Sequence, residues 1–566
     1  MAIGKIRMFA GAAVAGASLA LSGMSMYPAA AAGSPVLGHW APAAPVPGMS
    51  ALTSTSSTVS AVSCAPSADC AIGGTYDDAL GNPQAWVASG HAGAWSKATA
   101  LPGSITTGGG HSAINAVSCT TGNYCVAVGE TATNGSVDRA TVDVDLGGPW
   151  QQAMILLGAG TSSSQALSVS CPSAGNCTVS GWYRDASNQR QAFVEDEVNG
   201  TWGLFHDVGE ANPGGFAEVN SVSCQSPGNC NAAGEATILG GTPAAFFAAE
   251  VSGSWDQGDP IGRVVPTTGR SISCPASGDC VLTGTAIDDA SGHIEVYFME
   301  LHGRFFSLPV FLLGIQALNV GGTALDNSVS CASDGNCVVV GHYTDNIGRW
   351  QPFIAEEKGG TWQNAMPVPG IAALDAGHFS DLQSVSCASP GNCAATGFYT
   401  DASGNGQVFT VDEVNGTWGS PARLPGQSSQ GVFSPQSHVS CWSAGNCVTG
   451  GVVAASTGLQ AIVSVESPTA SATLATNTAM VKFGQEQAAQ LAIRVKPETG
   501  GTPAGTVTIR AGQTTLAVVP LNRGKATWTF PPKKLPPGTY QLTATYASTN
   551  GYDPVTSAKK KFVVTK

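Results

Sequence analysis

The sequence predicts an all-β chain built from a four-stranded unit that recurs eight times, and three regularities of its 566 residues carry that prediction. Pairs of cysteines separated by five residues occur eight times. A glycine stands ten positions after the first cysteine of every pair. An aromatic residue stands thirty-one positions after that cysteine in seven of the units. Spacing that is kept through so many copies indicates an internal structural repeat.

Each unit is predicted to contain four short β-strands. In the seventh unit, residues 384–387, 393–399 and 407–413 are rich in alternating and β-branched side chains, and Gly/Asn/Asp turns separate them. The fourth strand begins at Trp418, at the end of the sequence Asn-Gly-Thr-Trp. Four-stranded units of 50–57 residues in tandem predict a β-propeller.

The two ends of the array predict that it closes into an eight-bladed ring. The eighth unit ends near residue 466 without its tryptophan strand, whereas GHWAPAAPVPG at residues 38–48 matches GTWQNAMPVPG at residues 360–370. The N-terminal segment is therefore expected to supply the missing strand of the last blade, which removes exposed sheet edges. An open array and two halves of four units are the alternatives.

The cysteines are predicted to form one disulfide across the first hairpin of each unit. Zinc sites favour closer cysteine spacing, and the redox motif C-x-x-C does not occur. The predicted pairs are Cys64–Cys70, Cys119–Cys125, Cys171–Cys177, Cys224–Cys230, Cys274–Cys280, Cys331–Cys337, Cys387–Cys393 and Cys441–Cys447.

Residues 1–32 are predicted to be a cleavable export signal. Lys5 and Arg7 precede an apolar run over residues 8–21, and four alanines at 29–32 offer a cleavage site. No later apolar run is long enough to span a membrane, and paired cysteines suit an oxidising compartment. The sequence therefore predicts a secreted, extracellular protein whose first folded domain covers residues 33–466.

The turn before the fourth strand resembles a degenerate Asp-box, the turn motif of sialidase-like secreted propellers. In EVNGTW an acid stands five residues before the tryptophan, but the serine of the motif is absent and its glycine is displaced by one residue. The resemblance therefore implies only a structural role, in which acid and aromatic brace the turn between strands three and four. The acids are Asp145, Glu197, Glu250, Glu300, Glu357 and Glu413. The aromatics of the eight units are Trp40, Trp95, Trp150, Trp202, Trp255, Phe305, Trp362 and Trp418.

Residues 467–566 contain no cysteine and are predicted to form a separate immunoglobulin-like β-sandwich of roughly seven strands. Residues 502–508 and 535–546 resemble bacterial immunoglobulin-like repeats, which implies a spacer, display or adhesion module. Residues 468–566 hold 12 basic and 3 acidic residues, whereas 33–467 hold 10 and 34. The basic domain is thus a candidate for cell-wall contact, although its lysines also suit an ordinary solvated surface.

The candidate ligand-binding residues lie where the units vary in length. All variation in period falls between each aromatic and the next cysteine, in segments that should share one rim with the turns between strands two and three. Five of these turns place an aspartate fourteen positions after the first cysteine: Asp78, Asp185, Asp288, Asp345 and Asp401. Each aspartate either opens its turn through backbone hydrogen bonds or contributes to an acidic rim that binds Ca²⁺ or a cationic partner.

No catalytic residue can be assigned from the sequence. The histidines fall at non-equivalent positions, H-E-x-x-H and G-x-S-x-G are absent, and no arginine cluster of the sialidase kind is present. The strongly acidic array disfavours nucleic-acid binding. We expect a secreted or cell-surface protein that binds an extracellular carbohydrate or protein through the variable rim. No cofactor is predicted, and Ca²⁺ at the acidic rim is the alternative. A glycoside hydrolase or lyase and a structural envelope component are the alternative hypotheses.

Overall fold

The computed structural model describes residues 39–566 except 54, 104–108, 133–136, 157–162, 209–213, 239–240, 262–266, 277–278, 303–304, 428–435, 457, 469, 498–501, 549–551 and 553. The export signal predicted over residues 1–32 lies outside the described residues. The regular secondary structure of the described residues is nearly all β-strand, as the sequence predicted.

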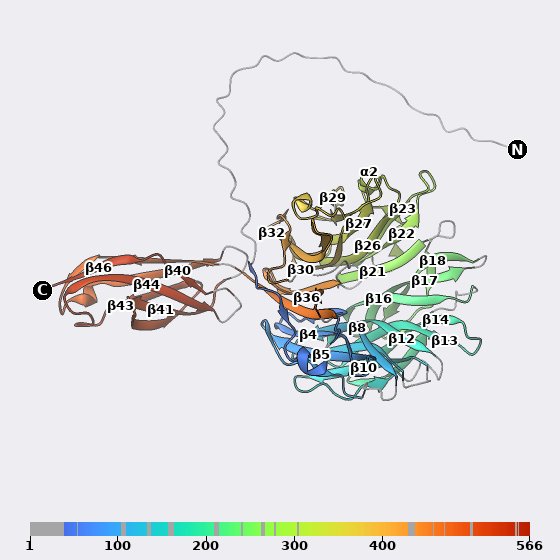
Figure 1. Ribbon diagram of the computed structural model, residues 1–566, viewed down its shortest axis with the longest axis horizontal. Helices are drawn as coiled ribbons and strands as arrows, with labels where there is room; N and C mark the ends of the chain where they lie inside the picture. The colour runs from blue at the N-terminus through green and yellow to red at the C-terminus, as the bar shows by residue number, and fades with distance from the viewer. Residues whose placement is uncertain are drawn as a thin grey trace, which may run out of the picture. The chain divides into compact units, whose positions relative to one another are not determined.

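Eight antiparallel sheets of four or five strands occupy the chain from His39 to Ser467, and they radiate from a common centre (Figure 1). Every sheet is one unit of the repeat, and in seven of them the strands follow sequence order from the first strand outward; in the eighth, the outer edge comes from the N-terminal residues His39–Trp40 and Ala44–Pro45. The first strands are β3 (Ala61–Cys64), β8 (His111–Thr120), β12 (Ser164–Ser173), β16 (Ala217–Ser226), β21 (Thr267–Ala276), β26 (Ala324–Ser333), β30 (Ser380–Ser389) and β35 (Ser437–Ser443). The second strands are β4 (Asp69–Asp77), β9 (Tyr124–Ala132), β13 (Asn176–Arg184), β17 (Asn229–Ile238), β22 (Asp279–Ile287), β27 (Asn336–Thr344), β31 (Asn392–Thr400) and β36 (Asn446–Ala455).

The third strands complete the body of each sheet, and short strands form its outer edge. The third strands are β5 (Pro83–His91), β10 (Arg139–Leu146), β14 (Arg190–Val198), β18 (Thr242–Val251), β23 (Ile294–His302), β28 (Trp350–Glu356), β32 (Gly406–Val414) and β37 (Gly458–Ser467). The edge strands are β1 (His39–Trp40), β2 (Ala44–Pro45), β6 (Ala94–Trp95), β7 (Thr99–Ala100), β11 (Met154–Ile155), β15 (Thr201–Asp207), β19 (Ser254–Trp255), β20 (Asp259–Ile261), β24 (Phe305–Phe306), β25 (Val310–Phe311), β29 (Met366–Pro367), β33 (Thr417–Trp418) and β34 (Ala422–Arg423). Single helical turns lie in the connections that follow: α1 (Met49–Leu52), α2 (Ile315–Leu318) and η1 (Ile371–Ala373).

The N-terminal segment pairs with the last unit. In β1, His39 and Trp40 lie opposite Ser467 and Glu466 of β37, in an antiparallel arrangement. Ala44 and Pro45 of β2 continue along the same strand. This is the pairing that the match between residues 38–48 and 360–370 predicted.

Neighbouring units are joined by a repeated hydrogen bond between their first strands. The backbone N–H of the first cysteine of each unit donates to the hydroxyl of the serine that precedes the first cysteine of the unit before it. The donor–acceptor pairs are Cys119–Ser63, Cys171–Ser118, Cys224–Ser170, Cys274–Ser223, Cys331–Ser273, Cys387–Ser330, Cys441–Ser386 and Cys64–Ser440. The last pair joins the first unit to the eighth, across 376 positions of sequence, at a distance of 2.9 Å.

The repeated glycine is required by a bulge in the first strand. In the seventh unit the register of β30 and β31 shifts between Leu382 and Ser384. This shift brings the carbonyl oxygen of Asp381 to within 1.9 Å of the place where a Cβ on Gly397 would stand. The glycines at the same position of units two to six face the same conflict, at 1.8–2.0 Å. Only glycine fits such a close backbone approach.

The hydrophobic core lies between consecutive sheets instead of in one central mass. Between the sixth and seventh units, for example, Val340 and Ile354 of one sheet pack with Leu382, Val385 and Phe409 of the next. Each sheet therefore buries both of its faces against its neighbours, which stabilises the array as a whole.

The C-terminal residues form two further sheets. One contains β38 (Ala470–Thr476), β40 (Gln490–Pro497) and β43 (Lys525–Thr529). The other contains β39 (Met480–Lys482), β46 (Lys560–Thr565), β44 (Gly538–Ser548), β41 (Gly505–Ala511) and β42 (Thr514–Pro520), with β45 (Val555–Thr556) beside β44 and η2 (Glu486–Ala488) after β39. Their core includes Phe530 stacked on Phe562 at a centroid distance of 4.7 Å. Two packed sheets of this size agree with the predicted sandwich.

Candidate functional site

The five predicted rim aspartates each begin a turn between a second and a third strand. One carboxylate oxygen of Asp185 accepts the backbone N–H groups of Ser187 and Gln189, at 2.8 and 2.9 Å. Asp78, Asp345 and Asp401 bind two backbone N–H groups of their own turns in the same way, and Asp288 binds one. The N–H of Gln189 is the largest cause that lowers the pKa of Asp185. Each carboxylate therefore holds its own turn, and the five residues lie on five separate turns.

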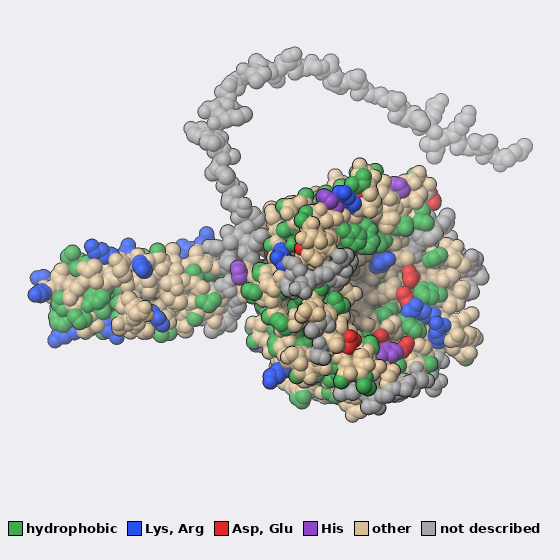
Figure 2. All heavy atoms as spheres, in the orientation of Figure 1, with side chains coloured by type: hydrophobic (Ala, Val, Ile, Leu, Met, Phe, Trp, Pro, Cys, Tyr) green, Lys and Arg blue, Asp and Glu red, His purple; other side chains and the backbone are tan. Residues whose placement is uncertain are grey.

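On the face in view, Figure 2 shows both acidic and basic side chains beside the central hollow of the eight-sheet part. No three His, Cys, Asp or Glu side chains of the described residues come together as a metal-ligand group. Calcium binding at the aspartate turns stays the alternative to their role in opening the turns.

Two of these turns lead directly into clusters that the sequence did not reveal. The guanidinium of Arg190, five residues after Asp185, lies 4.0 Å from the ring centroid of Trp182 and 5.1 Å from that of Phe216. The same guanidinium forms an ion pair with Glu218 at 2.6 Å. This cluster joins the third unit to the first strand of the fourth.

The second cluster occupies the corresponding place between the sixth and seventh units. Trp350, five residues after Asp345, stacks on His342 at 4.1 Å and on Phe379 at 4.5 Å. Nδ1 of His342 lies 3.1 Å from a carboxylate oxygen of Asp381. We call these two groups the rim clusters: Trp182, Arg190, Phe216 and Glu218, and His342, Trp350, Phe379 and Asp381.

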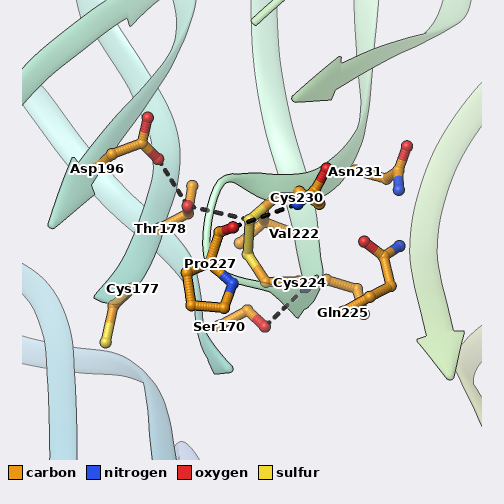
Figure 3. Close-up of a disulfide and its surroundings, with 12 residues drawn as sticks. Ser170, Cys177, Thr178, Asp196, Val222, Cys224, Gln225, Pro227, Cys230 and Asn231 are labelled. Atoms are coloured by element: carbon orange, nitrogen blue, oxygen red, sulfur yellow. Dashed lines mark hydrogen bonds between the residues drawn. A yellow bond between two sulfur atoms is a disulfide. The ribbon is translucent and has the colours of Figure 1, made fainter. Parts of the chain in front are cut away.

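The eight predicted disulfides are all present, one in each unit. They lie at the end of the sheets opposite to the aspartate turns, because strands one and two run antiparallel and the cysteines close their hairpin. Figure 3 shows this end of the fourth unit, where Ser170 accepts the N–H of Cys224 and Thr178 of the third unit lies beside Cys230.

The tryptophans of the Asp-box-like turns bind polar side chains of the preceding unit. Their backbone lies opposite the predicted acid, as Trp418 does to Glu413 and Trp255 to Glu250. The indole N–H, however, donates across the junction between units, in most cases to the residue six positions before the aromatic of the preceding unit. The donor–acceptor pairs are Trp40–Asp412, Trp150–Ser89, Trp255–Asp196, Trp362–Glu300 and Trp418–Glu356.

Two tryptophans test this explanation within the same chain. The indole N–H groups of Trp95 and Trp202 are buried and have no hydrogen-bond partner. Each packs in a cluster with a valine of the preceding unit, Val465 and Val144 respectively. Where the acceptor position carries Ser, Asp or Glu, the indole is satisfied. The position six residues before the aromatic was therefore the signal that sequence analysis overlooked.

These contacts place carboxyl groups in pairs at the junctions between units. Burial, together with the charge of Asp196, raises the pKa of Glu250 to about 7. Burial and the charge of Glu300 raise the pKa of Glu357 to about 7. Glu356 with Glu413 and Asp412 with Glu466 form corresponding pairs, and burial raises the pKa values of Asp412, Glu413 and Glu466.

Glycoside hydrolases usually act through a pair of carboxyl groups, one of which has a raised pKa and serves as the general acid. Here the same arrangement recurs at four junctions, each time beside a tryptophan that binds the other unit. An active site is expected at one place in the molecule, whereas a contact that joins units is expected at several equivalent junctions. The carboxyl pairs are therefore part of the scaffold.

A cleft opens at one of these junctions, between the third and fourth units. It has a volume of ≈ 380 Å³ and is lined by Pro172, Asn176, Cys177, Thr178, Asp196, Glu197, Val198, Asn199, Pro227, Gly228, Cys230, Glu250, Ser252 and Gly253. We call it the Val198 cleft. The corresponding cleft between the fifth and sixth units has only ≈ 20 Å³.

Comparison with known proteins confirms the predicted C-terminal domain. Residues 472–565 match the bacterial Ig-like domain (group 3). No curated protein sequence matches the chain. No helix among the described residues has the length and apolar character needed to cross a membrane.

Solved structures similar to this chain share little sequence with it. YCF48 from Cyanidioschyzon merolae is 13% identical with a TM-score of 0.35, and the match covers 63% of this chain and 96% of that one. An ulvan lyase, a polysaccharide lyase bound to a GlcA–Rha3S ligand, is 10% identical with a TM-score of 0.35, over 72% and 94% of the two chains. A mutant Trypanosoma rangeli sialidase with trans-sialidase activity is 11% identical with a TM-score of 0.31, over 62% and 53%. Similarities with TM-scores this low carry no argument about the activity of this chain. The match to a protein family concerns residues 472–565.

Proposed function

We propose that the chain is an exported binding protein whose repeat region is one closed, eight-bladed β-propeller. The eight serine–cysteine hydrogen bonds support closure, since the bond between Cys64 and Ser440 is of the same kind as the other seven. The disulfides and the bacterial Ig-like domain support an extracellular location. The ligand is an extracellular carbohydrate or protein, and the Ig-like domain serves as a spacer or adhesion module.

The observation that carries this proposal is the position of the rim clusters. In a repeat protein, features that all units share build the scaffold, and features confined to a few units are available for recognition. The disulfides and the serine–cysteine hydrogen bonds are of the first kind, and the carboxyl pairs recur at four junctions beside the tryptophans that join the units. The rim clusters occur at two junctions and combine half-buried aromatic rings with charged groups, which suits a binding surface.

The proposal is tested by binding on an array of extracellular polysaccharides and purified extracellular proteins. The variants Arg190→Ala and Trp350→Ala each remove one rim cluster, whereas Thr201→Ala is an exposed control on the opposite face. The two faces are separated by the length of a third strand, roughly 25–30 Å. We expect both rim variants to lose retention on the same ligand at least tenfold and the control to keep it, with each protein assayed well below its own melting temperature.

Each alternative has its own outcome in this experiment. Retention that neither rim variant alters would overturn the assignment of the rim. Absence of retention on every ligand would favour a structural envelope component. Release of shortened sugars from any polysaccharide of the array would favour a glycoside hydrolase or lyase.

The basic Ig-like domain is proposed to contact anionic cell-wall polymer. Its charged side chains in view are basic (Figure 2), and its lysines include Lys533, Lys534 and Lys559 to Lys561. Retention of the whole protein on purified cell walls should then fall steeply as ionic strength rises from 0.05 to about 0.5 M, because salt screens exposed charges. Retention that salt does not change would contradict this contact.

A further inference from the structure

A lysine of the sixth unit shows what the carboxyl pairs can hold. Nζ of Lys358 lies 3.0 Å from Oε1 of Glu356 and 3.6 Å from Oε1 of Glu413, and it donates to the carbonyl oxygen of Gly416 at 3.0 Å. An ammonium group has three N–H donors, so these three acceptors can satisfy it completely. We call Glu356, Glu413 and Gly416 the lysine site.

The same three acceptors exist at the Val198 cleft. Counted from the tryptophans of their units, Asp196, Glu250 and Gly253 correspond to Glu356, Glu413 and Gly416. The framework around them corresponds too, because Trp255 donates to Asp196 as Trp418 donates to Glu356. All three residues line the cleft.

The backbone turns that present these acceptors also agree. Ser252 and Gly253 have φ angles of 53° and 80°, and Asn415 and Gly416 have 50° and 80°. The carbonyl groups of the two glycines therefore leave turns of the same form.

Two of the residues that would hold an ammonium group differ between the junctions: Asp196 is one methylene shorter than Glu356, and the lysine itself is replaced. The position of Lys358 is occupied in the third unit by Val198, which is 45% exposed. The turns that follow are again alike, since Gly359 and Gly360 have φ angles of 57° and 77° and Asn199 and Gly200 have 51° and 81°. The backbone of Val198 is therefore equivalent to that of Lys358, but its side chain supplies no ammonium group to the carboxyl pair.

The charges around the Val198 cleft favour a cation. Its described lining contains Asp196, Glu197 and Glu250 and no lysine or arginine. Glu250 is only 6% exposed, and its Oε2 has no hydrogen-bond partner. The carboxylate of Asp196 accepts hydrogen bonds from the hydroxyl of Thr178 and the indole N–H of Trp255. The nearest basic group is Nε2 of His206, 3.7 Å from Oδ2 of Asp196. A buried carboxyl oxygen without a partner is costly, so a donor from outside would stabilise it.

We propose that the Val198 cleft is a binding site for a primary ammonium group, and that its occupant is a lysine side chain of a partner protein. The lysine ammonium binds Asp196, Glu250 and the carbonyl oxygen of Gly253, as Lys358 binds its three acceptors. The cleft is large enough for the aliphatic stem of the lysine as well as for its ammonium group. This site lies on the face opposite to the rim clusters, so it does not depend on the function proposed for them.

The test uses the whole protein and Nα-acetyl-lysine methylamide, with the norleucine analogue as the matched probe that lacks the ammonium group. Isothermal titration or NMR titration should give one site for the lysine probe and none for the norleucine probe. Val198→Lys should weaken binding at least tenfold, because its own ammonium group fills the site. Glu250→Gln should weaken binding at least tenfold by removing the charged acceptor. Lys358→Val should raise the stoichiometry from one site to two by exposing the lysine site.

The outcomes separate the proposal from its alternatives. Absence of saturable binding, or binding that Val198→Lys leaves unchanged in a protein with normal melting temperature, would overturn it. If Val198→Lys does not fold, Glu250→Gln and the stoichiometry of Lys358→Val decide the question. Tighter binding of 1,5-diaminopentane than of the lysine probe would assign the site to a free diamine and overturn the partner protein.

Discussion

The hydrogen bond between Cys64 and Ser440 gives the sharpest test of ring closure. Ser440→Ala removes the acceptor and leaves the half-buried N–H of Cys64 without a partner. A lost hydrogen bond of this kind costs about 1–2 kcal/mol, toward the lower end because the group is only part-buried. If the ring is closed, this cost must appear in the free energy of unfolding, since the first and eighth units then unfold together.

Ser63→Ala is the matched control, because it removes the equivalent acceptor, 3.0 Å from the N–H of Cys119, at a junction inside the array. Unfolding in guanidinium is followed by tryptophan fluorescence, to which the Ig-like domain contributes only Trp528 of the 12 tryptophans. Both variants should lower the free energy of unfolding by the same about 1–2 kcal/mol. A normal midpoint for Ser440→Ala beside a lowered one for Ser63→Ala would refute closure and support an open array.

Three further predictions concern the scaffold and the aspartate turns. Gly397→Ala should prevent folding or lower stability by more than about 3 kcal/mol, because its Cβ would overlap the carbonyl oxygen of Asp381, whereas Gly148→Ala, with no atom within 4 Å, should have little effect on the urea midpoint. Stability should fall as pH rises from about 5 to 8, because the folded state keeps protons on carboxyls whose pKa is raised, such as Glu250 to about 7, that the unfolded chain has released. Each such carboxyl contributes on the order of 1 kcal/mol after screening. Glu250→Gln should therefore make the urea midpoint depend less on pH, measured at three pH values. An equal dependence on pH in the variant and the wild-type protein would contradict this explanation. Calcium at millimolar concentration should leave the melting temperature unchanged, because the aspartates already bind their own turns; a rise that Asp185→Asn abolishes would instead establish a calcium site.

The scaffold could be predicted from the sequence because its determinants are local. Cysteines six positions apart, an Asn-Gly turn before Trp418 and a glycine opposite a bulge each act within one hairpin. The pairing of Trp40 with Glu466 is not local, but the similarity between residues 38–48 and residues 360–370 made it predictable from the sequence. Repetition thus supplied the long-range information that a single copy lacks.

The candidate sites could not be predicted because they are made by neighbouring units. The hydrogen-bond acceptors of Trp150, Trp255, Trp362 and Trp418 lie 59–62 residues earlier in the chain, and no spacing within one unit points to them. Arg190 meets Phe216, and Trp350 meets Phe379, only after two sheets have packed together. Val198 in unit three and Lys358 in unit six occupy equivalent positions. That difference points to a binding site only once the carboxyl pair and the carbonyl group around each position are known.

The pairing of β1 with β37 sets an order of assembly. Each disulfide closes a hairpin of a few residues, so the first seven units can oxidise and form their hairpins before the rest of the repeat has folded. The eighth sheet has no such freedom, because its outer edge is residues 39–45 and its other strands end at Ser467. Contacts of such high sequence separation form late. The first segment of the repeat must therefore wait for its last part, and a translation product truncated before unit eight would leave residues 39–45 without the strand that they pair with and open to proteolysis.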